Sequence, residues 1–179
     1  MLTDTQRAEA AGYLAFKASV SAVNDHLLPN ARRVVVPPMT PVDAAKFYHD
    51  DHNNPYTGDP VFGVVDFYTN PNRLQAGLVS GSVSGLFIDC DDVAGWYHTA
   101  VRQTPGYTSR VVTLIDHRIV GSHVICPYMA PDGTHGVLDT NGHHILPDLE
   151  ESTICDFFTN LYKAEGYVYL GMLDSPYPF

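Results

Sequence analysis

Basic side chains are scarce in this sequence of 179 residues, which has 10 Lys and Arg against 20 Asp and Glu and a formal net charge of -10. Its largest basic cluster is the pair Arg32-Arg33. Nucleic acids and anionic membrane surfaces bind clustered cations, so this composition argues against both. We therefore expect neither nucleic acid nor a membrane among the partners.

Cysteine is also scarce. The three cysteines, Cys90, Cys126 and Cys155, are odd in number and have no metal-finger spacing. The sequence therefore offers neither a disulfide framework nor a zinc finger, and at least one thiol is free if all pairing is within the chain. We expect Cys126 and Cys155 to lie in the core, because both sit on apolar faces.

Long apolar runs are absent, since none approaches the ~18 residues that indicate a transmembrane helix. The N-terminal residues 1–7 also lack a basic start followed by an apolar segment, the pattern of a signal peptide. The location expected by default is cytoplasmic, or within a viral particle.

The apolar fraction of 45% and the charged fraction of 17% are typical of a globular chain, and the length fits one domain. Helices come first along the chain and an antiparallel meander follows, which predicts an α+β fold. Caps and helical spacing predict helices over 3–28, 41–50, 70–79, 91–103 and 147–165. Strands are predicted over 110–116, 122–129, 135–139 and 167–173, with a strand or short buried segment over 61–67 and a surface loop over 50–60.

Cys90 stands where a loop enters a predicted helix, within Asp89-Cys90-Asp91-Asp92-Val93-Ala94. The unpaired N–H groups and the dipole of a helix start stabilise a thiolate and lower the pKa of a thiol there. A thiolate that attacks a carbonyl also needs a general base, which a third group orients. The neighbouring carboxylates oppose thiolate formation by their charge, so we interpret them as helix caps or ligands of nearby backbone.

A base and an orienting carboxylate are both present downstream. His123 begins one predicted strand and Asp139 ends the next, with the turn signal Pro131-Asp132-Gly133 between them. Antiparallel pairing about that turn brings both residues to the same end of the sheet, within side-chain reach.

These segments resemble the transglutaminase-like branch of the papain-like cysteine peptidases, and most closely its bacterial transglutaminase-like cysteine proteinases. The matching pieces are Asp89-Cys90-Asp91-Asp92-Val93-Ala94, His123-Val124, Asp132-Gly133 and Val137-Leu138-Asp139-Thr140-Asn141. The resemblance implies a papain/transglutaminase-like α+β fold, with the nucleophile at a helix N-terminus that packs on an antiparallel sheet. It implies one domain over 1–179, made of a helical part (1–60), a catalytic-like core (61–142) and a C-terminal helix and strand (143–179).

The same resemblance implies a Cys-His-Asp triad: Cys90 the nucleophile, His123 the general base and acid, and Asp139 the group that orients the imidazole. The oxyanion would be met by the backbone N–H of Cys90 and an upstream polar side chain, either Asn72 or Gln75. The implied activity is that of a thiol hydrolase, a peptidase or amidase that acts on a peptide or protein through an acyl-thioester. Acyl transfer to an amine stays open, and no cofactor is implied.

A different class of function also stays open: a catalytically silent module of the same fold, serving as a structural or binding component of a larger assembly such as a viral particle or tail. The aromatic, proline-containing tail over 175–179 either packs on its own domain or anchors a partner subunit.

The nine histidines raise a metal hypothesis as well. The candidate ligands lie in two clusters, His49-Asp50-Asp51-His52 and His143-His144, and Cys90 could add a sulfur. We interpret the first cluster as solvated loop and expect no metal. His135 and His143 lie near the hairpin and compete with His123 as base, but neither is followed by the aliphatic strand residues that follow His123.

Overall fold

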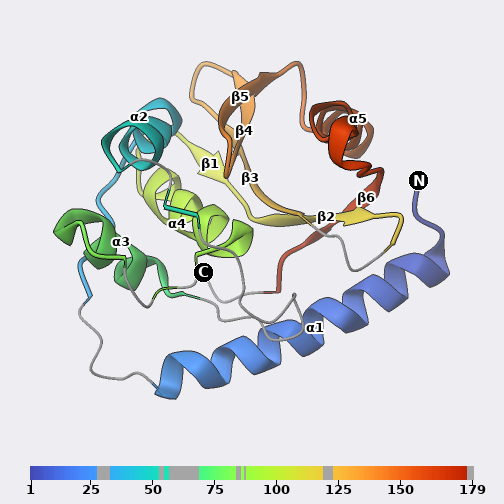
Figure 1. The fold of residues 1–179 in the computed structure, drawn as a ribbon. Helices are drawn as coiled ribbons and strands as arrows, with labels where there is room; N and C mark the ends of the chain where they lie inside the picture. Colours follow the sequence, from blue (N-terminus) through green and yellow to red (C-terminus); the bar gives the residue numbers. More distant parts are fainter. Residues whose placement is uncertain are drawn as a thin grey trace.

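The computed structural model describes residues 1–27, 33–52, 55–56, 69–83, 86, 88–118 and 123–176, with the side chains of 20–27 left out. An antiparallel sheet lies between helices on both of its faces (Figure 1). The predicted α+β class is therefore confirmed. The predicted segment over 61–67 lies outside the described residues, as do the last three residues of the C-terminal tail.

The main path of the sheet has the strand order β5-β4-β3-β2-β6, and each neighbouring pair is antiparallel. A short strand, β1, pairs with β3 off this path. Four strands, β2, β3, β4 and β6, match predicted strands, whereas β1 and β5 were not predicted. The bounds are β1 Thr108–Ser109, β2 Val112–Asp116, β3 His123–Met129, β4 His135–Asp139, β5 Gly142–Leu146 and β6 Tyr169–Asp174.

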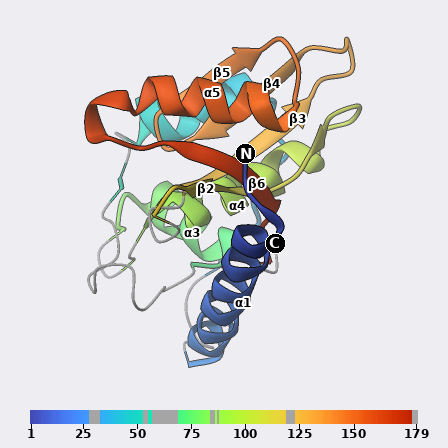
Figure 2. The same cartoon turned by 90° about the vertical axis from the view of Figure 1, so that its right-hand side faces the viewer.

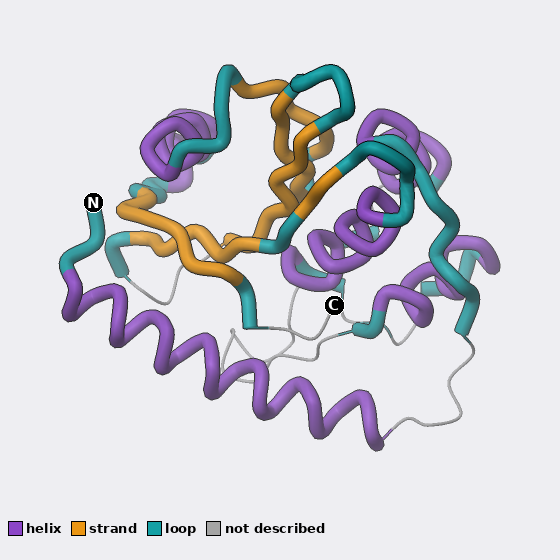
Figure 3. The backbone as a smooth tube through the Cα atoms, turned by 180° about the vertical axis from the view of Figure 1, so that it is seen from behind, coloured by secondary structure: helices purple, strands orange, loops and turns teal. Residues whose placement is uncertain are grey.

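The alternation of side chains along β3 divides the core in two. Val124 and Cys126 face the helices α2 (Pro41–Lys46), α3 (Pro71–Ser80) and α4 (Cys90–Arg102), whereas Ile125 faces α5 (Glu151–Leu161). Figure 3 shows the strands between these two groups of helices. Both sheet faces are thus buried, which holds β3 and β4 rigidly at the centre.

The long helix α1 (Asp4–Leu27) begins near β6 (Figure 2) and runs below the other helices and the sheet in the view of Figure 1. Ala10 and Leu14 bury their side chains against Ile115 of β2. Arg7 donates to the carbonyl oxygen of Met172 at 3.1 Å and forms an ion pair of 3.0 Å with Glu151 of α5. The first turns of α1 therefore join the edge of the sheet to α5.

Two helices have other bounds than the sequence predicts. The segment predicted as one helix over 41–50 is α2 followed by a π-helical turn, Phe47–Asp51. The helix predicted over 147–165 begins only at Glu151, because Asp148 accepts a hydrogen bond from the backbone N–H of Glu150 and forms a turn first. No helix within the described parts of the chain has the length and apolar character needed to cross a membrane.

Candidate functional site

Cys90 is the first residue of α4, and its position is fixed by a reciprocal capping box. Asp89 accepts a hydrogen bond from the backbone N–H of Asp91, and Asp92 accepts one from the N–H of Asp89. Asp92 also accepts a hydrogen bond from the backbone N–H of Thr69. The expectation that the carboxylates beside Cys90 serve the backbone is thus confirmed for Asp89 and Asp92, and the cysteine is held at a helix start.

The structure brings His123 and Asp139 together at the predicted end of the hairpin. Nε2 of His123 lies 3.0 Å from Oδ2 of Asp139. The register that pairs Cys126 with Leu138 sets this approach, because it places the start of β3 beside the end of β4. The side chain of Asp139 has no exposed surface, and that of His123 is 11% exposed. This contact is therefore shielded from bulk water.

Asp139 accepts hydrogen bonds on both carboxylate oxygens. Oδ2 also accepts a hydrogen bond from the hydroxyl of Tyr162 at 2.8 Å. Oδ1 accepts one from Nε2 of His144 at 3.1 Å and one from the backbone N–H of Asn141 at 3.0 Å. Burial by itself raises the pKa of Asp139, but the hydrogen bonds from His123 and His144 outweigh it and hold that pKa well below its ordinary value. Asp139 is therefore an ionised, fully buried acceptor at neutral pH.

Tyr162 closes the site at the end of α5. Its hydroxyl accepts a hydrogen bond from Nδ2 of Asn141 at 2.6 Å and lies 3.4 Å from Nε2 of His123. Its ring stacks on Phe158 with centroids 6.1 Å apart. Burial raises the pKa of Tyr162 far above its ordinary value, and the neighbouring Asp139 raises it further. The hydroxyl thus keeps its proton and donates a hydrogen bond to Asp139.

A cavity of about 320 Å³ opens over these groups. Cys90 and His123 both line it, although they come from different elements, the start of α4 and the start of β3. The other described residues that line it are Tyr56, Thr140, Asn141, Tyr162, Tyr167 and Tyr169. A partly exposed thiol and an imidazole bonded to a buried carboxylate therefore face one solvent-accessible space.

The two candidates for the oxyanion position lie in α3 and bond elsewhere. Oδ1 of Asn72 accepts the backbone N–H of Val36 at 3.1 Å, and Oε1 of Gln75 accepts the indole N–H of Trp96 at 2.8 Å. Gln75 is 2% exposed. Neither residue is among the described residues that line the cavity, because both side chains hold α3 to its neighbours.

The two adjacent histidines of the metal hypothesis point in different directions. His143 and His144 are adjacent in β5 and face opposite sides of the sheet, so His143 bonds the hydroxyl of Tyr128 and His144 bonds Asp139. Nδ1 of His52 contacts the carbonyl oxygen of Phe47 at 2.6 Å. The adjacent histidines of β5 therefore do not form a chelating pair.

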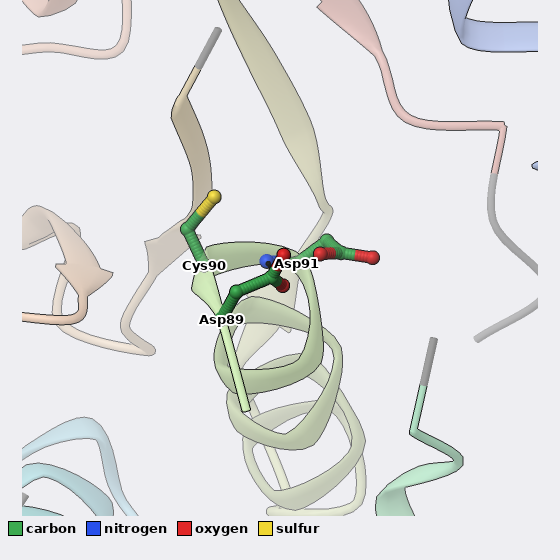
Figure 4. Close-up of side chains that lie close together, drawn as sticks. All are labelled: Asp89, Cys90 and Asp91. Atoms are coloured by element: carbon green, nitrogen blue, oxygen red, sulfur yellow. Dashed lines mark hydrogen bonds between the residues drawn. The ribbon is translucent and has the colours of Figure 1, made fainter. Parts of the chain in front are cut away.

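Within the described residues, one group brings three potential ligand atoms within 4.8 Å of one another: Asp89, Cys90 and Asp91. Figure 4 shows the side chains of Cys90 and Asp91 leaving the first turn of α4 in different directions. Capping explains the position of the Asp89 carboxylate. Acidic groups at a helix start are common without any ion, so this cluster does not define a metal site.

Tyr162 and His144 are the partners of Asp139 that the sequence did not predict, since His144 was considered only as a candidate metal ligand. Tyr162 lies 23 positions and His144 five positions beyond Asp139. No motif marks either one. Each reaches Asp139 only through tertiary structure, Tyr162 through the docking of α5 and His144 through the pairing of β5 with β4.

The fold and the site define an α+β protein with a cavity lined by a thiol and by an imidazole that is bonded to a buried carboxylate. No protein-family model and no curated protein sequence matches this chain. Among solved structures it is similar to calcium-bound LapG of Legionella pneumophila, with 18% identity, 82% of this chain and 80% of that chain covered, and a TM-score of 0.39. A similarity of this size assigns no role to individual residues.

Proposed function

We propose that this protein is a thiol hydrolase, a peptidase or amidase of the papain/transglutaminase-like type, with Cys90, His123 and Asp139 as its triad. The observation that carries the proposal is that one cavity is lined by Cys90 at a helix start and by an imidazole bonded to a buried carboxylate. This combination supplies a nucleophile, a base and an orienting group.

The hydrogen bond to Asp139 determines which nitrogen of His123 acts as the base. Because Asp139 is held ionised, Nε2 of His123 carries a hydrogen and donates a hydrogen bond to the carboxylate. The lone pair of the neutral ring is then on Nδ1, which takes the proton of the Cys90 thiol. Asp139 stabilises the imidazolium that results, and the carboxylate itself stays unprotonated.

The proposed reaction has two steps, acylation of Cys90 and hydrolysis of the thioester. The Cys90 sulfur adds to the substrate carbonyl, and the imidazolium of His123 gives its proton to the departing amine as the C–N bond breaks. Water gives a proton to His123 as it adds to the thioester. The C–S bond then breaks, the carboxylic acid leaves, and His123 returns the proton to the Cys90 sulfur. The backbone N–H of Cys90, at the first position of α4, is the proposed donor to the oxyanion.

An extended polypeptide is the substrate that the surface favours. Asn141 lines both the cavity over Cys90 and a second, more open cavity of about 380 Å³, to which His49 and His143 contribute. Asn141 is thus the described residue that the two cavities share. A chain that crosses this residue places side chains in both cavities, which a small amide does not.

Alkylation by iodoacetamide tests the proposal without knowledge of the substrate. Burial raises the pKa of Cys155 to about 11 and that of Cys126 further still, so we expect Cys90 to react first at pH 6.5. Exposure alone also favours Cys90, so the decisive comparison is His123→Ala, which should slow Cys90 at least tenfold. His135→Ala, on the same sheet but away from Asp139, is the matched control. Equal rates in wild type and His123→Ala would overturn the proposal.

A further inference from the structure

The carboxylate of Asp139 contacts a second imidazole, that of His144. Nε2 of His144 lies 3.1 Å from Oδ1 of Asp139, while Nε2 of His123 lies 3.0 Å from Oδ2. The backbone N–H of Asn141 and the hydroxyl of Tyr162 complete the set, so each oxygen has two donors. The plane of the carboxylate is therefore fixed from both sides.

The register of β4 and β5 explains why His144 reaches Asp139. Asp139 pairs with Gly142, and Val137 pairs with His144. Residues that pair share a sheet face, so His144 is a diagonal neighbour of Asp139 on the α5 side. Its ring is fixed by two aromatic contacts, with centroids 5.1 Å from Phe157 and 6.2 Å from Phe158. The side chain is 20% exposed, so its position is set mainly by packing.

We propose that His144 is a positioning residue, whose Nε2–H holds Oδ1 of Asp139 so that Oδ2 remains directed at His123. This inference rests on the proposed function, because it assigns His144 a role in that triad. His144 is not among the described residues that line the cavity over Cys90, so it acts through Asp139 and does not compete with His123 as the base.

The physical reason is the cost of a buried charge. An ionised carboxylate without exposed surface needs its oxygens satisfied by donors, and a neutral imidazole supplies one N–H at the required place. Without this donor, Oδ1 keeps only the backbone N–H of Asn141. The carboxylate is then held by three donors in place of four, so the direction of its hydrogen bond to His123 is less firmly fixed.

Two variants with side chains of similar size separate donation from packing. His144→Gln keeps an N–H donor on a long side chain, and His144→Met has a similar shape without a donor. Measured by the iodoacetamide rate at Cys90 between pH 5 and 9, His144→Met should be about tenfold slower near neutral pH, because it removes a hydrogen bond to a charged group. His144→Gln should remain within about threefold of wild type, and so should the control His135→Met.

The outcomes distinguish failure of the inference from failure of the proposed function. A Cys90 whose alkylation does not depend on His123 contradicts the triad itself. A His123-dependent Cys90 that reacts equally fast in folded His144→Met contradicts the role of His144. Should His144→Met not fold, as judged by thermal unfolding, His144→Gln decides: a folded Gln variant slowed tenfold shows that its N–H does not replace that of the imidazole, and the inference is wrong.

Discussion

Nε2 of His123 and Oδ2 of Asp139 lie 3.0 Å apart although 16 positions separate the two residues in the chain. One hairpin closes that distance, and the same carboxylate is buried without exposed surface. The hydrogen bond therefore combines fixed geometry with a low local dielectric, which is the condition under which an orienting carboxylate has its largest effect on a base.

The stability of the protein should depend on Asp139 in acid. A group whose folded-state pKa is depressed contributes stability that is fully present above its unfolded pKa, about 3.9, and is lost as the pH falls through the folded value. We expect wild type to lose stability below about pH 4 and Asp139→Asn to lose less over the same range. Urea unfolding at pH 7, 4 and 3 measures this. Parallel losses in both proteins would contradict the assignment.

The capping box of α4 should be worth more than an ordinary helix cap. Asp92 is 1% exposed and accepts from two backbone N–H groups, those of Asp89 and Thr69. Asp92→Ala leaves both without this acceptor, so we expect a loss of about 2–4 kcal/mol in the free energy of unfolding, given ~1–3 kcal/mol for each buried group left unsatisfied. Chemical denaturation measures it, with Asp156→Ala on the exposed side of α5 as the control. A loss no greater than in the control would show that the cap does not hold α4.

The cavity should favour substrates with cationic side chains. Four tyrosines line it, and no Lys or Arg is among its described lining residues. Arg118 lies 4.7 Å over the ring of Tyr167, and from there to Lys163 the sequence has no Lys or Arg. Peptides that differ only by Lys or Glu next to the cleaved bond should differ several-fold in kcat/KM in favour of Lys, and added salt should reduce the difference. A preference for Glu would contradict this.

The sequence was sufficient for the parts of the site that depend on local structure. The capping pattern of α4 predicted where Cys90 lies, and the turn Pro131-Asp132-Gly133 predicted that His123 and Asp139 meet. Both depend on interactions within a few residues or within one hairpin. These are the contacts that propensity and turn chemistry determine.

The remaining partners depend on docking and register. His144 could not be assigned as a partner of Asp139 because β5 was not predicted. The sheet face on which a strand residue lies is known only when the pairing of that strand is known. Tyr162 reaches Asp139 only because α5 packs on the sheet. Gln75 precedes the cysteine, as an oxyanion donor was expected to, but the orientation of α3 directs its side chain to Trp96.

The pH dependence of Cys90 alkylation, measured in wild type and in His123→Ala, tests whether Cys90 and His123 act together. We expect wild-type Cys90 to react with iodoacetamide already near pH 6.5, well below the ordinary thiol pKa of about 8.5, and His123→Ala to shift the midpoint toward the ordinary value. One curve shared by both proteins, with its midpoint at the ordinary value, would contradict the claim that Cys90 and His123 act together.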